Sequence, residues 1–507
     1  MADFDLAIIG GGINGAGIAR DAAGRGLKVV LLEQNDLASG TSSASSKLIH
    51  GGLRYLEHGS LSLVRAALSE REVLLRAAPH LIRPLRFVLP VERSGRSRLV
   101  LRLGLLLYDV IGRRKILPGT RSLDLITDEA GQPLKRRLQR GYEYSDCFAD
   151  DARLVVANAI GAAEAGASIL TRTRCTRADR SDIWQLILNS RGRRDVVTAR
   201  VLINAAGPWV DTVAETVLRQ APRRRLRLDK GSHIVVPRLY DHDRAYILQA
   251  GDNRVVFAIP FQNDFTLIGT TDRNFSGDPA AAVPTGEETE YLCGVINNYF
   301  RTAVGAADVV WAFAGVRALH EDGTRSPQDI GRDYTLGLDK PFGEAPLLTV
   351  YGGKLTTYRR LADEALGRLA QFFPRSQSWS HSWTANSPLP GGDFVYDGVP
   401  ALVARAQQRW PFLGRPQSER LVRAYGTRVE KVLQGAARLE DLGENFAAGL
   451  TAAEVRYLMA NEWAQTADDV LWRRSKLGLR FSQKERAALE CFMTLADKGD
   501  SRYNDPP

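Results

Sequence analysis

Residues 5–34, DLAIIGGGINGAGIARDAAGRGLKVVLLEQ, limit the fold of this chain more than any other part of its sequence. An apolar run at 5–9, typical of a buried parallel strand, leads directly into three glycines at 10–12. Small residues in a helical pattern continue to Arg25, and a second apolar run at 28–33 ends in an acid. The segment therefore predicts a complete βαβ unit and an α/β fold.

The residue types in this unit fit the binding of a dinucleotide. Gly10 permits a tight turn, Gly12 lets the backbone approach a pyrophosphate, and Gly15 lets the helix pack closely on the strand. The N-terminus of the helix offers free N–H groups and a positive dipole end to the phosphates. Glu33 stands where a carboxylate accepts hydrogen bonds from ribose hydroxyls. The unit alone does not distinguish NAD from FAD.

Composition narrows the range of partners and compartments. The net charge of +10 favours anionic partners, which include nucleic acid, an acidic membrane surface and a phosphorylated substrate. The four cysteines are far apart and form no CxxC pair, so we expect reduced thiols in a cytosolic compartment. The N-terminus has no signal-peptide layout, and no apolar run is long enough to predict a membrane-spanning helix.

The rest of the chain predicts mixed structure followed by helices. Hairpins are expected at 182–209 and 254–272, and a strand, a Gly-Gly turn and a helix at 347–366. A linker rich in Pro, Gly and Ser at 382–394 precedes helical periodicity, which includes all of 450–479. We therefore expect a separate C-terminal helical domain.

Several stretches between residues 5 and 366 together carry a family resemblance. They are IIGGGINGAGIARDAAGRGL, TSSASSKLIHGGLRYLEHG, YEYSDCFADDARLV, INAAGPWV, KGSHIVVP, IGTTD, GVRAL and YGGKLTTYRRLA. With these motifs the sequence resembles the FAD-dependent glycerol-3-phosphate dehydrogenases of the aerobic, respiratory type, and the tail ADDVLWRRSKLGL also fits.

The resemblance implies an FAD-binding Rossmann-like domain of the amino-acid-oxidase-like flavoprotein type, joined to a mixed-sheet substrate domain and a C-terminal helical domain. The expected boundaries are 1–72, 145–220 and 345–385 for the FAD-binding domain, 73–144 and 221–344 for the substrate-binding and membrane-facing domain, and 390–507 for the C-terminal helical domain.

The same resemblance implies where FAD binds. The segment 41–48 is expected to cover the pyrophosphate and the flavin edge, and a glycine pair then turns the backbone beside the isoalloxazine. The residues expected to bind FAD are Gly10, Gly12, Ile13, Asn14, Gly15, Glu33, Thr41, Ser42, Ser43, Ser46, Lys47, Leu48, Gly51, Gly52, Ala206, Gly207, Gly353, Lys354, Leu355 and Thr356.

The implied reaction is oxidation of sn-glycerol 3-phosphate to dihydroxyacetone phosphate by hydride transfer to FAD, after which a membrane quinone takes the electrons. A phosphate dianion requires fixed guanidinium or ammonium donors, and the alcohol requires neighbouring groups that orient it. The residues expected to bind the substrate are Arg54, Tyr55, Thr271, Asp272, Arg317, Arg332 and Lys354.

The proton acceptor stays open at this point among His233, His50 and Lys354. A histidine with an unperturbed pKa of ~6.5 accepts a proton at neutral pH. The charge of Lys354 would stabilise reduced flavin, and Arg317 completes the set of expected catalytic residues. The histidine spacing predicts no metal site.

Residues 93–115 predict the contact with a membrane that quinone reduction requires. Six arginines and one lysine surround Leu99, Leu103, Leu106 and Val110, which fall on one face of a helix. The alternative is a core helix with solvated arginines. The expected location is peripheral, on the cytoplasmic face of the plasma membrane, and a homodimer is compatible with the sequence.

Three other functions compete with this interpretation. The first is an oxidase that passes electrons from glycerol 3-phosphate to O2. The second is an amine or amino-acid oxidase of the same fold, in which Arg317 would bind a carboxylate. The third is a nucleic-acid-binding protein without redox activity, although no zinc finger, RNA-recognition signature or basic recognition helix occurs.

Overall fold

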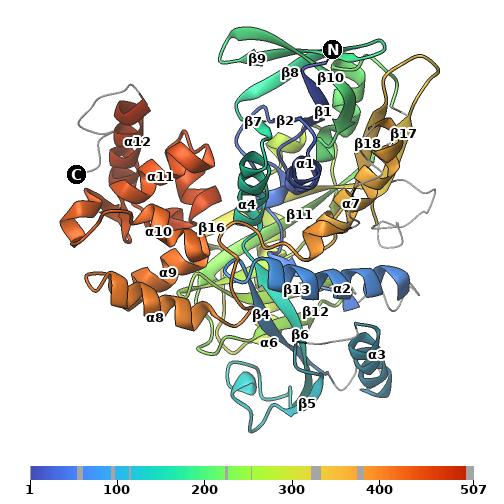
Figure 1. Ribbon diagram of the computed structural model, residues 1–507. Coiled ribbons are helices and arrows are strands. Elements are labelled where there is room, and N and C mark those ends of the chain that lie inside the picture. The colour runs from blue at the N-terminus through green and yellow to red at the C-terminus, as the bar shows by residue number, and fades with distance from the viewer. Residues whose placement is uncertain are drawn as a thin grey trace.

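The computed structural model describes residues 2–53, 61–92, 98–112, 116–222, 226–252, 254–320, 333–373, 379 and 382–497. Two large sheets form the frame of the molecule, and the orange and red helices of the C-terminal region lie to one side of them (Figure 1). The predicted α/β class with a mixed second sheet is thereby confirmed.

The first sheet has the strand order β17-β18-β10-β1-β2-β7, and β8 and β9 extend it from β10. Its strands are β1 Phe4–Ile9, β2 Val29–Leu32, β7 Ser168–Leu170, β8 Thr173–Arg180, β9 Trp184–Ser190, β10 Arg193–Asn204, β17 Thr335–Asp339 and β18 Leu347–Tyr351. The strands β18, β10, β1, β2 and β7 are parallel, as the apolar sequence of β1 predicts.

The second sheet has the order β15-β11-β14-β13-β12-β4-β6-β3, with β16 beside β11 and β5 beside β6. Its strands are β3 Leu48–Ile49, β4 Ile82–Pro90, β5 Arg121–Asp124, β6 Arg140–Ala149, β11 Leu226–Pro237, β12 Ala245–Gln249, β13 Val255–Phe261, β14 Phe265–Gly269, β15 Arg273–Asn274 and β16 Trp311–His320. The antiparallel pair β11 and β16 matters most for function, because both strands reach the candidate site.

Helices cover both sheets and form most of the C-terminal region. They are α1 Ile13–Gly24, α2 Leu61–Ala77, α3 Arg98–Ile111, α4 Asp151–Glu164, α5 Val210–Thr216, α6 Gly286–Tyr299, α7 Tyr358–Leu369, α8 Val399–Arg409, α9 Arg415–Tyr425, α10 Val429–Val432, α11 Ala452–Glu462 and α12 Gln483–Asp497. None of the helices in the described ranges is both long and apolar enough to cross a membrane.

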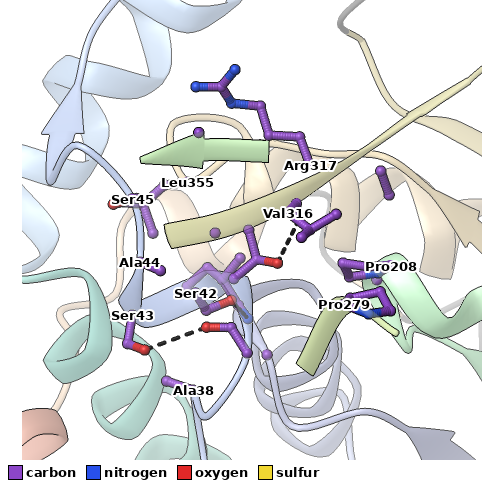
Figure 2. Close-up of a pocket in the computed structure, with 18 of the residues that line it drawn as sticks. Ala38, Ser42, Ser43, Ala44, Ser45, Pro208, Pro279, Val316, Arg317 and Leu355 are labelled. Carbon is purple, nitrogen blue, oxygen red and sulfur yellow. Dashed lines mark hydrogen bonds between the residues drawn. The ribbon is translucent and has the colours of Figure 1, made fainter. Parts of the chain in front are cut away.

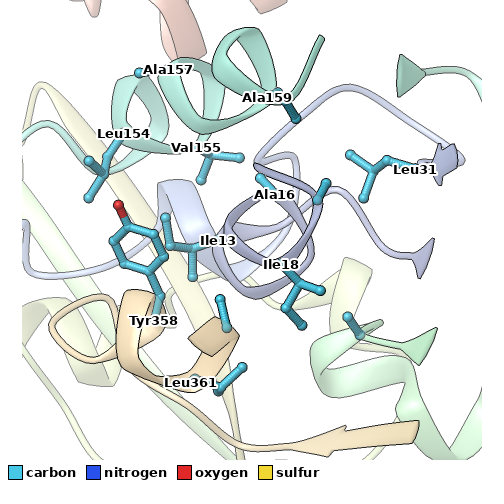
Figure 3. Close-up of a cluster of buried hydrophobic side chains, with 14 of the residues drawn as sticks. Ile13, Ala16, Ile18, Leu31, Leu154, Val155, Ala157, Ala159, Tyr358 and Leu361 are labelled. Atoms are coloured by element: carbon cyan, nitrogen blue, oxygen red, sulfur yellow. The ribbon is translucent and has the colours of Figure 1, made fainter. Parts of the chain in front are cut away.

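Helix α1 lies between α4 and α7 in the largest hydrophobic core (Figure 3). Small side chains on α1 allow this close packing. At Gly17, for example, a Cβ atom would lie 2.6 Å from the ring of Tyr358 on α7. The hydroxyl of Tyr358 in turn accepts a hydrogen bond of 3.0 Å from Asn158 on α4. The βαβ unit predicted from the sequence is therefore confirmed, and α7, which comes much later in the chain, packs against its helix.

One predicted boundary falls inside a hairpin. Residues 221–344 were expected in the substrate domain, but β17 pairs with β18 in the first sheet. The strand pairing therefore moves the boundary to before Thr335.

The helical pattern predicted for 450–479 is interrupted after Glu462 and continues only in shorter helical pieces. Helix α11 ends there because Trp463 adopts a left-handed φ of 57°, and a short π-helix at Asp469–Arg474 and a 3-10 helix at Leu477–Arg480 follow. Asp469 accepts hydrogen bonds from the backbone N–H groups of Gln465 and Thr466, which holds the chain in a turn. A two-stranded hairpin, β19 Asn445–Ala447 with β20 Leu450–Thr451, also interrupts the helices.

The predicted amphipathic helix is present as α3. Its described inner face packs against α2 through Leu105 and Tyr108, which are fully buried. On its outer face, Leu103, Leu106 and Val110 are 57%, 46% and 73% exposed. The fourth residue predicted for that face, Leu99, has a side chain outside the described part. The structure thus shows both a core-facing side and an exposed apolar side.

Candidate functional site

A cavity of about 1370 Å³ lies where the two sheets and the C-terminal region meet. Figure 2 shows part of it, with residues 42–45 on one side and Val316 and Arg317 of β16 across from them. The residues predicted for the site that line this cavity are Gly10, Gly12, Ile13, Asn14, Glu33, Thr41, Ser42, Ser43, Ser46, Leu48, His50, Gly51, Gly52, Ala206, Gly207, His233, Thr271, Asp272, Arg317, Gly353, Lys354, Leu355 and Thr356.

Five predicted site residues do not appear in that lining. Arg54, Tyr55 and Arg332 lie outside the described residues, and nothing follows about their positions. Gly15 packs inside the βαβ unit. Lys47 is buried beneath the cavity wall.

The glycines of the first turn are required by close backbone contacts. Gly10 has a φ of +116°, and a Cβ atom there would lie 2.5 Å from the carbonyl oxygen of Ala205. A Cβ atom at Gly15 would lie 1.9 Å from the oxygen of Gly10, so the helix and strand approach as predicted. Gly12 needs no unusual φ, but a Cβ atom there would come within 3.1 Å of the Ser42 hydroxyl.

Glu33 holds this turn in place while also lining the cavity. Its Oε2 accepts a hydrogen bond of 2.7 Å from the N–H of Gly11, and its Oε1 accepts one of 2.8 Å from the N–H of Asn35. Burial raises the pKa of the carboxyl group, although these two hydrogen bonds oppose the shift. The Glu33 carboxylate therefore stabilises the glycine turn and also lies where the ribose of a dinucleotide is expected.

The segment 41–48 lies directly on β16. Thr41 Oγ1 donates a hydrogen bond of 2.7 Å to the carbonyl oxygen of Val316. Gly315 lies beneath Ala44, whose oxygen would be 2.8 Å from a Cβ atom at that glycine. Lys47 secures the segment from below, because its Nζ donates to both carboxylate oxygens of Asp151 at 2.8 Å.

The turn at 352–356 is tied to the start of α1. Asn14 Nδ2 donates a hydrogen bond of 3.1 Å to the oxygen of Gly352. Asn14 Oδ1 is buried and has no hydrogen-bond partner among the described residues. An orphaned acceptor at the N-terminus of α1, beside glycines that leave the backbone accessible, fits a bound dinucleotide. Glu33, at the end of β2, supplies a carboxylate for the ribose, so the residues present fit FAD.

At the other end of the cavity, Arg317 is held from the strand beside it. Its register partner on β11 is Asp229, and Nη1 lies 2.8 Å from Asp229 Oδ2. Nη2 donates to the Thr270 hydroxyl at 3.3 Å, and Asp272 lies 3.9 Å from the guanidinium. A Cβ atom at Gly231 would lie 2.8 Å from Nη2, so this glycine makes room for the side chain. The result is an oriented cation at the cavity wall.

The two aspartates beside Arg317 act as a pair. Burial, followed by a hydrogen bond to Asp272, raises the pKa of Asp229 to about 7, and Arg317 opposes the shift. Two carboxylates this close together share a proton near neutral pH. The charge around Arg317 therefore depends on pH in the physiological range.

His233 lines the cavity but is almost fully buried. Its ring lies over Gly269, where a Cβ atom would come within 2.0 Å of Cδ2, and it stacks on Phe313 at 5.0 Å and 10°. Its Nε2 lies 2.9 Å from the Ser46 hydroxyl, and its buried Nδ1 has no hydrogen-bond partner among the described residues. Burial lowers its pKa to about 3, with Arg317 contributing, so the ordinary value expected from sequence is wrong here.

The remaining predicted residues differ in their surroundings. His50 faces the ring of Phe257, and its backbone N–H donates to Thr356 at 3.3 Å. Thr271 is buried and donates to Glu288 at 2.9 Å, so its hydroxyl is committed to the protein. Lys354 lines the cavity on the 352–356 turn.

Sequence reasoning missed three contributors to this end of the site. Asp229 forms an ion pair with Arg317. The Tyr108 hydroxyl donates a hydrogen bond to Asp146 and accepts one of 2.8 Å from the N–H of Gly51. Trp472 reaches the cavity from the C-terminal region. The alternation of WAFAGVR, which puts Trp311, Phe313 and Arg317 on one face of β16, is the signal that could have pointed to an aromatic wall.

Comparisons with known proteins agree with this geometry. Residues 5–359 match the family described as FAD dependent oxidoreductase, and residues 382–499 match the C-terminal domain of alpha-glycerophosphate oxidase. The glycerol-3-phosphate dehydrogenase of Pseudomonas aeruginosa is 53% identical over 96% of this chain and 94% of its own length. The D-erythritol 1-phosphate dehydrogenase of Brucella abortus is 48% identical over 96% of both chains.

Among solved structures, the chain is similar to the glycerol-3-phosphate dehydrogenase from Bacillus halodurans complexed with FAD. The TM-score is 0.73 at 26% identity, and the match covers 99% of this chain and 95% of that one. The predicted fold class, family and cofactor are therefore confirmed.

Proposed function

The chain belongs to the FAD-dependent oxidoreductase family and, within it, to the glycerol-3-phosphate dehydrogenases, from which we propose that it oxidises sn-glycerol 3-phosphate to dihydroxyacetone phosphate. The observation that carries the proposal is Arg317, an oriented guanidinium, on the same cavity wall as His233, a buried neutral imidazole. A phosphorylated alcohol needs this combination of an anion anchor and a proton acceptor.

FAD, when bound, supplies the acceptor for the hydride that leaves the alcohol carbon. Arg317 binds the phosphate and thereby sets the distance between the alcohol and the cavity wall. His233 is unprotonated at neutral pH, and its Nδ1 has no hydrogen-bond partner in the part of the chain that the structure describes, so it takes the hydroxyl proton. Lys354 adds positive charge to the lining of the same cavity. His50 remains the competing proton acceptor.

The low pKa of His233 has a consequence for how the proton is taken. A group with a pKa of about 3 is a weak base in the free protein. A phosphate dianion bound to Arg317 neutralises the cation that helps to lower this pKa, so substrate binding raises the basicity of the imidazole. The proton acceptor is thus strengthened by the presence of its own substrate.

We further propose that the electrons pass to a quinone at a membrane surface and that α3 makes the contact. The exposed side chains of Leu103, Leu106 and Val110 form an apolar face beside Arg102. A basic helix with an exposed apolar face suits the interface of an anionic bilayer. The expected site of action is the cytoplasmic face of the plasma membrane.

Two substitutions on α3 test the membrane contact. The double variant Leu106→Ser/Val110→Asp should lose co-sedimentation with vesicles that contain an anionic phospholipid. Val395→Asp alters another valine that is 68% exposed, outside α3, and should bind as the wild type does. Equal binding of the double variant and the wild type would remove α3 from the proposal.

The electron acceptor separates the dehydrogenase from the two oxidases of the same fold. We expect rapid turnover of glycerol 3-phosphate with a soluble quinone analogue and little peroxide with O2 as the sole acceptor. Faster turnover with O2 would favour the glycerol-3-phosphate oxidase, and turnover of glycine or sarcosine would favour the amine or amino-acid oxidase.

The similarity to a D-erythritol 1-phosphate dehydrogenase supports a second candidate substrate. Both compounds present a phosphate monoester and secondary alcohols, so Arg317 and His233 serve either one. Measuring kcat/KM for the two substrates decides between them. A larger value for D-erythritol 1-phosphate would replace glycerol 3-phosphate in the proposal while leaving the chemistry unchanged.

A further inference from the structure

A row of stacked rings connects the C-terminal region to the candidate proton acceptor. Trp472 stacks on Trp311 at 4.6 Å and 25°, and Trp311 contacts Phe313 at 4.5 Å and 35°. Phe313 stacks on His233 at 5.0 Å and 10°. All four side chains line the same cavity, and Trp472 comes from a separate C-terminal domain match.

The position of Trp472 is fixed by its own neighbours. A Cβ atom at Gly478 would lie 2.6 Å from the indole, so this glycine leaves space for the ring to lie against Trp311. Lys476 donates a hydrogen bond to the carbonyl oxygen of Trp472. The ring therefore lies close to both Gly478 and Trp311.

Buried ion pairs fix the same segment to the dinucleotide-binding part. Arg474 donates to both oxygens of Asp36 at 2.8 Å, and both side chains are completely buried. Arg474 also donates to the carbonyl oxygen of Glu462. Buried charged pairs of this kind fix one arrangement, because a shift would leave a charge without its partner. The C-terminal segment thus has one defined position at the cavity.

We infer that Trp472 is a positioning residue, which acts through Trp311 and Phe313 to hold the ring of His233 in place and to keep water from it. The inference rests on the proposed function, because it takes His233 as the proton acceptor. It gives the C-terminal domain a role in the site beyond stabilising the fold. Stacked aromatic rings resist both tilting and sliding, so the loss of the outermost ring loosens the inner ones.

Water at His233 would change its protonation. The charged groups that face this imidazole are Arg317 on β16, Lys47 beneath the 41–48 segment and Asp151 at the start of α4. None of them changes when Trp472 is replaced. Relief of the burial alone would raise the pKa of His233 toward the ordinary ~6.5. Because the imidazole must be unprotonated to act, the acid limb of kcat/KM would then move to higher pH.

The test uses the holoenzyme and three variants. Trp472→Ala should lower kcat by roughly 10- to 100-fold, the range expected for a misplaced catalytic group, and move the acid limb to higher pH. Gly478→Ala should shift both quantities in the same direction, because it pushes the ring without removing it. Trp472→Phe should restore most of kcat. KM for the substrate should change little, since Arg317 is not displaced.

A second readout does not depend on activity. Mass spectrometry after brief treatment with diethyl pyrocarbonate should show modification of His233 in Trp472→Ala and protection in the wild type. His80 is buried elsewhere and should stay protected in every variant, which controls for general unfolding. Trp410→Phe alters a buried tryptophan of the C-terminal core and should leave His233 protected.

The outcomes separate this inference from the proposed function. If the wild type does not oxidise either polyol phosphate, the proposed function fails. If the wild type is active but Trp472→Ala keeps the pH profile, the kcat and the protection of His233, then Trp472 does not position the histidine and the inference is overturned.

Discussion

The nucleotide end of the cavity is walled mainly by backbone, whereas the substrate end is walled mainly by side chains. At the first, Gly10 and Gly15 let strand and helix approach within one continuous segment of the chain. At the second, Asp229, His233 and Arg317 come from β11 and β16 and act through their side chains. The comparison teaches that one end depends on local geometry and the other on strand register.

The largest effect is expected from a substitution that deforms the glycine turn at the nucleotide end of the cavity. Gly15→Ala would place a Cβ atom 1.9 Å from the Gly10 oxygen, so the turn must deform and its N–H groups can no longer face a pyrophosphate. The purified variant should contain little or no FAD, as the ratio of flavin to protein absorbance would show. In Gly294→Ala on α6, the added Cβ would meet no atom of the described residues within 4 Å, so this variant should retain full flavin. A fully yellow Gly15→Ala protein would contradict the account of this end.

Arg317→Ala should affect the substrate end alone. Loss of a charged hydrogen bond of about 1.5–3 kcal/mol predicts a KM for glycerol 3-phosphate raised by roughly 10- to 100-fold, with FAD retained. The control is Arg227→Ala on β11, where the guanidinium bonds to Asn274 instead of facing the cavity. Steady-state kinetics with both variants would show whether the phosphate anchor has been assigned correctly. An unchanged KM in Arg317→Ala would exclude it.

Asp229→Asn should change how the stability of the protein depends on pH. The pKa of Asp229 is about 7 in the folded protein and ~3.9 in an unfolded chain. The folded protein therefore binds more protons at this site between these values, and its stability falls as pH rises through the window. The difference in free energy of unfolding between wild type and Asp229→Asn should decrease from pH 4 to pH 7 and level off above it. Urea unfolding at several pH values measures this, and a flat difference would contradict the shared proton.

The smallest effect is expected from the buried hydrogen bonds behind Gly51, which lines the cavity. Tyr108→Phe removes the hydroxyl that links the Gly51 N–H to Asp146, so two buried groups lose a partner. The free energy of unfolding should fall by about 1–2 kcal/mol. Tyr291→Phe removes a hydroxyl that bonds to exposed Asp252 and should cost less. An equal decrease in the free energy of unfolding in the two variants would show that the buried hydrogen bonds of Tyr108 stabilise the protein no more than the exposed one of Tyr291.

The difference between the two ends also explains what sequence could predict. The βαβ unit and its glycines follow from spacing over 29 residues, and the structure places them as predicted. The contact between Asp229 and Arg317 depends on a strand register across 88 positions, which no local pattern reveals. The low pKa of His233 arises from burial, which belongs to the tertiary structure.

The C-terminal region also shows a feature that local sequence patterns could not predict. Its helical periodicity extends through 450–479, yet α11 ends at Glu462 and the next helical piece, Asp469–Arg474, is short and tied down by buried ion pairs. Arg172 binds Asp469, and Arg474 binds Asp36; in each pair the two residues are more than 290 positions apart in the sequence. Those pairs place Trp472 at the cavity, and no periodicity could have predicted it.

Anaerobic mixing of the purified yellow protein with sn-glycerol 3-phosphate tests the central claim most directly. We expect the flavin absorbance of the wild type to bleach at saturating substrate, and the Arg317→Ala protein to require a far higher concentration for the same bleaching. A wild-type flavin that stays oxidised at saturating glycerol 3-phosphate, in a protein with full cofactor content, would contradict the account.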